Sequence, residues 1–86
     1  MSEGDPLVLL VQEFRLLQQL VFEGVDVAEL TPVGRVLLKY LYVHGLTTFV
    51  GIEAVPTPLG RAVVEHVPEE QDGVVVIPAS VLEGLR

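Results

Sequence analysis

The sequence predicts a small, mainly α domain of the α+β class, with three to four helices, a long N-terminal helix and a short β element near residues 73–77. Three observations predict it. An apolar 3-4 pattern fills the first quarter of the chain, and a Thr-Pro-x-Gly-Arg signature that starts helices occurs twice. An acidic turn followed by Val-Val-Val-Ile predicts the β element. With 86 residues, the chain fits a single domain.

The first helix is predicted over residues 6–23, capped by Asp5, opened by Pro6 and closed by Gly24. Its main apolar stripe follows 3-4-3-4 spacing and consists of Leu7, Leu10, Phe14, Leu17 and Val21. Further leucines at 9, 16 and 20 make the stripe wider than one small domain covers. We therefore expect these five residues to pack both in the core and against a second copy. The alternative is a helix that lies across the core alone.

The first Thr-Pro signature predicts a second helix after an acidic link over residues 25–30. Thr31 would cap it, Pro32 would open it, His44 would lie in its last turn and Gly45 would end it. Its predicted buried face is Val33, Val36, Leu37, Tyr40 and Leu41.

Residues 46–55 are ambiguous between a strand and a helix. Leu-Thr-Thr-Phe-Val favours a strand by propensity, whereas Thr47 or Thr48 could cap a short helix over residues 49–54. We expect the short helix.

The second Thr-Pro signature predicts a third helix that begins at Thr57 and Pro58 and ends before Pro68. The expected buried residues are Leu59, Ala62, Val63 and His66, with Arg61 and Glu65 as an exposed i, i+4 pair. A polar turn over residues 69–73 then leads to a strand over residues 74–77 that is covered on both faces. Pro78 and Ser80 would start a final helical turn that docks Val81, Leu82 and Leu85.

Residues 30–77 resemble the winged-helix branch of the helix-turn-helix families. The similar stretches read LTPVGRVLLKYLYVHG, LTTFVGIEA, PTPLGRAVVEHV and DGVVVIP. The resemblance implies a winged-helix-like unit in which Thr57 to Val67 is the recognition helix, with Arg61 as its only cationic residue. That helix carries Val, Val and Glu where DNA readers carry Arg, Lys, Asn or Gln, which favours a protein-interaction module.

The charge balance weighs against nucleic acid as the main partner. Twelve acidic residues face five Lys and Arg, giving a net charge of −7 that repels a phosphate backbone. Half of the residues are hydrophobic, an apolar composition for so small a chain, and this indicates cover by another protein. We expect a homodimer that also binds a protein partner.

Residues that could support catalysis or metal binding are few. The chain has no cysteine, which excludes thiolate chemistry and fits a cytoplasmic protein. His44 and His66 stand alone near helix ends, and the carboxylates of residues 69–72 are typical of a solvated turn. We expect no cofactor, no metal, no enzymatic activity and no membrane-spanning segment.

Three cationic residues are candidates for contact with an anion or a nucleic acid: Arg35, Lys39 and Arg61. Two helix N-termini and two arginines could form one anion-binding patch. The alternative, which we favour, pairs the arginines with Glu29, Glu53 or Glu65 at the surface. The predicted function is an acidic, non-catalytic, homo-oligomeric interaction or regulatory module, and the alternative is a dimeric DNA-binding regulator that uses residues 57–67.

Overall fold

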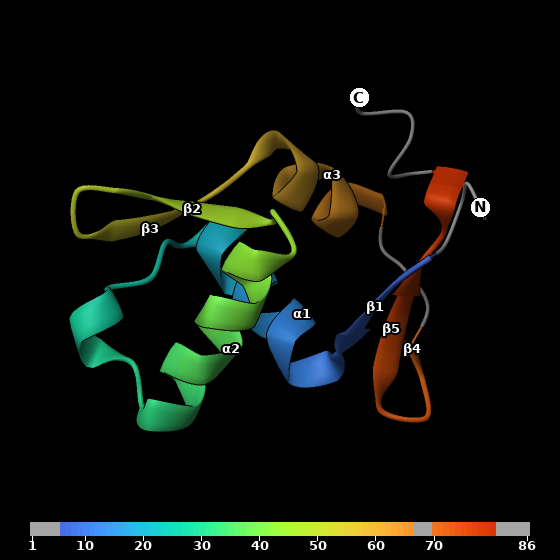
Figure 1. The fold of residues 1–86 in the computed structure, drawn as a ribbon, viewed down its shortest axis with the longest axis horizontal. Helices are drawn as coiled ribbons and strands as arrows, with labels where there is room; N and C mark the ends of the chain where they lie inside the picture. The colour runs from blue at the N-terminus through green and yellow to red at the C-terminus, as the bar shows by residue number, and fades with distance from the viewer. Residues whose placement is uncertain (1–5, 67–69, 81–86) are drawn as a thin grey trace.

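The computed structural model describes residues 6–66 and 70–80, which form helices and two small sheets (Figure 1). The elements in chain order are β1 (Leu7–Leu10), α1 (Val11–Phe22), a 3-10 turn (Val27–Glu29), α2 (Pro32–Val43), β2 (Thr47–Val50), β3 (Glu53–Pro56), α3 (Pro58–His66), β4 (Glu70–Gln71) and β5 (Val74–Ile77). One sheet is antiparallel with the order β1-β5-β4, and the other is the β2-β3 hairpin. The first and last strands therefore lie side by side.

The predicted long N-terminal helix is wrong for residues 6–10. Residues 7–10 form β1, which pairs with β5 in the register Leu7 with Ile77 and Leu10 with Val74. The helix starts only at Val11, where the Glu13 carboxylate accepts the backbone N–H of Leu10 at 3.2 Å. The run Leu-Val-Leu-Leu is compatible with both a helix and a strand. Its pairing with the apolar strand β5 makes it a strand in this structure. The predicted cap Asp5 lies outside the described residues.

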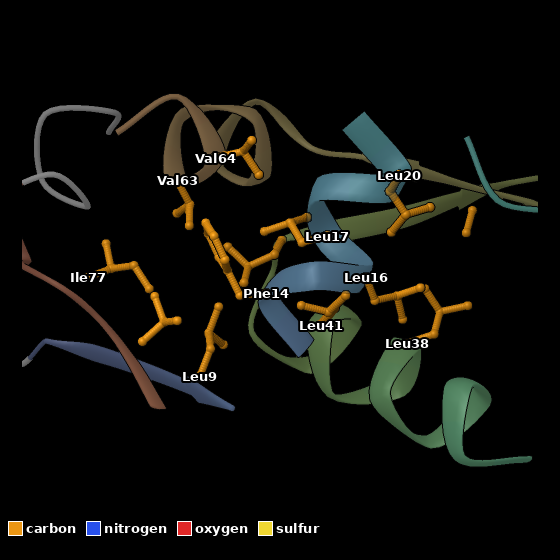
Figure 2. Packing of buried hydrophobic residues seen from close by; sticks show 13 residues of the cluster. Leu9, Phe14, Leu16, Leu17, Leu20, Leu38, Leu41, Val63, Val64 and Ile77 are labelled. Carbon is orange, nitrogen blue, oxygen red and sulfur yellow. The ribbon is translucent and has the colours of Figure 1, made fainter. Parts of the chain in front are cut away.

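α1 is the centre of the core. Its leucines at 16, 17 and 20 and Phe14 are buried, and Figure 2 shows Leu16 near Leu38 and Leu41 of α2. From another side, α3 and the three-stranded sheet contribute Val63, Val64, Leu9, Val75 and Ile77 to the same cluster. A 12-residue helix thus contacts every layer of the domain.

The predicted short helix over residues 49–54 is also wrong. β2 and β3 form an antiparallel hairpin in which Thr47 faces Pro56 and Val50 faces Glu53. The β-branched residues favour the extended form, and Gly51 adopts a φ of +64° at the turn, a conformation that glycine tolerates. The buried Thr47 hydroxyl donates to the Val55 carbonyl oxygen at 2.7 Å. This hydrogen bond links β2 to β3 and helps to hold the two strands in the observed register.

The two helix starts predicted from Thr-Pro are confirmed. Thr31 Oγ1 accepts the Gly34 N–H and Thr57 Oγ1 accepts the Gly60 N–H, each at 3.0 Å. α2 ends at Val43, before Gly45 with its positive φ, as the sequence predicts. α3 ends at His66, which is exposed, so the prediction that His66 is buried is wrong; Val64 takes that place in the core.

The strand predicted over residues 74–77 is confirmed as β5, but the polar turn before it is shorter than expected. Glu70 and Gln71 form β4 and pair with Val75 and Val74. Asp72 and Gly73, both with positive φ, make the turn itself. The predicted docking of Val81, Leu82 and Leu85 lies outside the described residues.

The fold class therefore differs from the prediction. The chain is a small α+β protein with short helices and strands in two sheets, so the expectation of a mainly α, winged-helix-like domain with a long first helix is overturned. Propensity and periodicity identified the helix interiors, whereas the strands at 7–10 and 53–56 are defined by partners that are distant or turn-linked.

Candidate interaction surface

Within the described residues, α2 carries more exposed large apolar side chains than any other element. Four residues follow one line along this helix at 3-4-3 spacing, and we call them the α2 stripe: Val33, Val36, Tyr40 and Val43. Their side chains are 67%, 49%, 47% and 70% exposed. The same helix packs against α1 through Leu38 and Leu41 on its other side. α2 is thus apolar on two faces and fills the core with only one of them.

An aromatic contact joins the exposed side of α2 to the hairpin. The rings of Tyr42 and Phe49 have centroids 5.5 Å apart at an angle of 48°. Both residues are about half exposed. Tyr42 lies about 100° around α2 from Val43, so this pair is a second apolar spot that the cationic residues of α2 separate from the stripe. The contiguous exposed apolar area of the α2 stripe itself marks an interaction site more often than a solvated face.

Two cations follow one edge of the stripe. Arg35 and Lys39 lie one helical turn apart, and Lys39 sits between Val36 and Val43 on the helical surface. We call this pair the cationic edge. Both residues are exposed, and the helix carries no acidic residue along its whole length. The outer side of α2 is therefore apolar and positive on a chain whose net charge is −7.

The predicted anion site is not assembled as one patch. Arg35 and Lys39 lie together on α2, but Arg61 lies on α3, which Figure 1 shows on another side of α1. Arg61 lines a hollow of about 510 Å³ together with Asp26, Glu53 and apolar residues of α1 and β3. The Asp26 carboxylate also accepts the Ala28 N–H at 3.0 Å. Arg61 thus has acidic neighbours, whereas the cationic edge has none on its own helix.

The five residues predicted as an oligomer interface are mostly not available to a partner. Phe14 and Leu17 are buried in the core of the single chain, and Leu7 and Val21 are half-buried. Only Leu10 is exposed, at 44%, and it lies on the outer face of the β1-β5 pair beside Val8. Shortening α1 to 12 residues lets the single domain cover the wide leucine stripe, so most of the apolar surface left open lies elsewhere.

The two histidines, the other candidate residues, lie at the surface of the part of the chain that the structure describes. His44 and His66 are both exposed at helix ends, on α2 and α3 respectively. Within residues 6–66 and 70–80, no three His, Asp or Glu side chains gather so as to hold a metal ion. None of the helices in these ranges is long and apolar enough to cross a bilayer.

Sequence reasoning missed the α2 stripe because it merged two faces into one. The predicted buried face combined Val33, Val36 and Tyr40 with Leu37 and Leu41, which lie on different sides of the helix in the structure. A signal was present: Val43 continues the spacing of Val36 and Tyr40, and the only charged residues of the helix follow one edge of that line.

The comparisons with known proteins do not assign this arrangement to a family. The chain matches no family model, and no curated protein or solved structure is significantly similar to it, so nothing in these comparisons identifies a winged-helix domain.

Proposed function

We propose that this chain is an acidic, non-catalytic interaction module that binds a partner protein through the outer side of α2. The single observation that carries the proposal is the exposure of the α2 stripe. Of the eleven large apolar side chains that are exposed within residues 6–66 and 70–80, five lie on α2 and three on the adjoining hairpin: Val33, Val36, Tyr40, Tyr42, Val43, Phe49, Val50 and Ile52.

The size of this surface supports a specific contact. The four residues of the stripe expose roughly 300 Å² of side chain at the observed fractions, taking usual areas for Val and Tyr. A standard protein interface buries about 800 Å² on each partner, and the weaker transient ones bury less. The surface therefore suits a transient or regulatory partner.

A peptide-display selection tests this proposal. Helical peptides are selected on the wild-type chain and counter-selected on Tyr40→Asp, which changes one exposed residue at the middle of the stripe. We expect enriched peptides that bind the wild type at least about tenfold more tightly than the variant, because a buried unpaired carboxylate weakens an apolar contact. Selected peptides that bind both proteins equally would contradict the proposal.

We also propose that the module is a homodimer, with the outer face of the β1-β5 pair as the contact between copies. Val8 and Leu10 are exposed there, opposite the half-buried Val76 and Val74. Among the described residues of β1 and β5 this face carries no charged side chain, so packing these strands on their symmetry mates opposes no like charges.

The mass in solution tests the homodimer. Light scattering should give twice the chain mass of 9.4 kDa for the wild type and the single-chain mass for Leu10→Lys. Ile52→Lys, at the exposed tip of the hairpin, is the matched control and should remain a dimer. A wild type that stays monomeric at high concentration would contradict the proposed homodimer, but it would not bear on the proposed binding of a partner protein by α2.

A further inference from the structure

We propose that the α2 stripe and its cationic edge bind an acidic amphipathic helix of a partner protein. The inference rests on the proposed function and adds the chemistry of the partner. It combines two features of one helix, an apolar line at heptad-like spacing and a row of positive charge beside it.

The spacing of the stripe fits a helix better than an extended segment. Val33, Val36, Tyr40 and Val43 repeat at 3 and 4 residues, as the a and d positions of a two-stranded helical contact do. α2 has 12 residues, so the seam extends over about 18 Å, or nearly two heptads. A partner helix with apolar residues at the same spacing can lie along it and exclude water from all four side chains.

The cationic edge determines the charge of the partner. In heptad terms Lys39 occupies a position that flanks the seam, where charged residues select the partner helix. Arg35 lies one turn before it on the same edge. Glu or Asp at the flanking positions of the partner would pair with Lys39 and be attracted by Arg35 farther from the seam, whereas Lys or Arg there would be repelled.

A second copy of α2 could cover the apolar stripe, but it would supply no acidic partner for the two cations. Two copies packed in parallel place Lys39 of one beside Leu37 and His44 of the other, and two packed antiparallel place the cationic edges together. Neither arrangement supplies a carboxylate, because α2 has none. Duplex DNA would meet the cations but leave the apolar stripe in water, and the acidic chain repels it. An acidic amphipathic helix satisfies both features.

Two labelled synthetic peptides test the inference on the full chain. Each has about 18 residues with Leu at the a and d positions, and they differ only in carrying Glu or Lys at the flanking positions. Fluorescence anisotropy at low salt should show the Glu peptide binding about tenfold more tightly than the Lys peptide. Salt at 0.5 M should shrink this ratio, since exposed charge pairs are screened over a few ångströms at that ionic strength.

Charge reversal supplies the matched variants. Arg35→Glu combined with Lys39→Glu should invert the preference in favour of the Lys peptide. The control combines Arg15→Glu with Arg61→Glu, which changes the net charge equally at two exposed positions outside α2 and should keep the preference for the Glu peptide. Circular dichroism of each variant establishes that the fold is retained.

The outcomes separate this inference from the proposed function. If both peptides bind the wild type equally and neither binds Tyr40→Asp, the proposal of an acidic partner is contradicted. The proposal that the α2 surface is an interaction site would still hold. No binding of either peptide would contradict both. Duplex DNA of random sequence that competes with the Glu peptide and binds more tightly would overturn the inference, as would a wild-type dimer that Tyr40→Asp converts to a monomer.

Discussion

The two Thr-Pro-x-Gly-Arg segments start helices in the same way and in different surroundings. In both, the Thr hydroxyl accepts the Gly N–H at 3.0 Å and Pro occupies the first helical turn. The segment at Thr31 lies at the surface, whereas the one at Thr57 is tied to the end of α2. The shared Thr-Pro-x-Gly-Arg pattern therefore dictates the same cap, and the tertiary structure gives the second copy a further role.

That further role is a close approach between α3 and the segment after α2. The Thr57 N–H donates to the Leu46 carbonyl oxygen at 3.1 Å, and the Thr57 hydroxyl donates to the Gly45 carbonyl oxygen at 2.7 Å. A Cβ at Gly60 would lie inside contact distance of the same Leu46 oxygen. A Cβ at Gly34 would meet only side-chain atoms of Leu30 and Thr31, at 3.3–3.5 Å.

The largest expected difference between the two segments is therefore at their glycines. Gly60→Ala should destabilise the protein by about 2–3 kcal/mol, because the Leu46 backbone cannot move aside without shifting β2. Gly34→Ala should change the free energy of unfolding by less than about 0.5 kcal/mol, since a helix-propensity gain offsets two tight side-chain contacts. Urea unfolding of the two variants measures the difference, and equal values would mean that α3 is not docked on Leu46.

The threonines should show a smaller difference. Thr31→Val removes one capping hydrogen bond and should cost about 1 kcal/mol. Thr57→Val removes the cap and the hydrogen bond to Gly45 and should cost about 2 kcal/mol. Thr57→Ser keeps both hydroxyl contacts and is the control, with an expected loss below about 1 kcal/mol. The comparison fails if Thr57→Val is no worse than Thr31→Val in chemical denaturation.

The arginines should differ least in stability and most in binding. Both are exposed, so Arg35→Ala and Arg61→Ala should each change the free energy of unfolding by less than about 0.5 kcal/mol. Of the two, only Arg35 belongs to the cationic edge, so Arg35→Ala should lower the affinity for the Glu peptide by about threefold and Arg61→Ala should leave it unchanged. Anisotropy titrations of the two variants check this, and an equal loss from Arg61→Ala would place the peptide elsewhere.

Local features of the sequence were sufficient where one hydrogen bond or one residue type decides the conformation. Thr31 and Thr57 with their prolines located two helix starts, and Gly24 and Gly45 located two helix ends. The run Val74 to Ile77 identified a strand from β-branched composition alone. Each of these signals acts within about four residues, so no distant partner is needed to interpret it.

The candidate surface was beyond the reach of the same reasoning. Apolar periodicity identified α2 as a helix, but Leu38 and Leu41 face α1 while Val36 and Tyr40 face away from it. A helix that is apolar on two sides can turn either one inward, and the shape of α1 selects the side with leucines. Which apolar residues remain exposed is therefore a property of the packed domain.

The sequence by itself determined the helix caps, the acidic charge and the absence of cysteine chemistry, because composition and short-range hydrogen bonding do not depend on the rest of the fold. The tertiary structure alone decided that residues 7–10 are a strand, that Phe14 and Leu17 belong to the core, and that the α2 stripe is open. Each of these outcomes depends on competition between segments far apart in the chain. β5 pairs with residues 7–10, which are more than 60 positions away in the sequence. This pairing makes residues 7–10 a strand, so α1 begins only at Val11, and the core of a single chain covers the shorter helix.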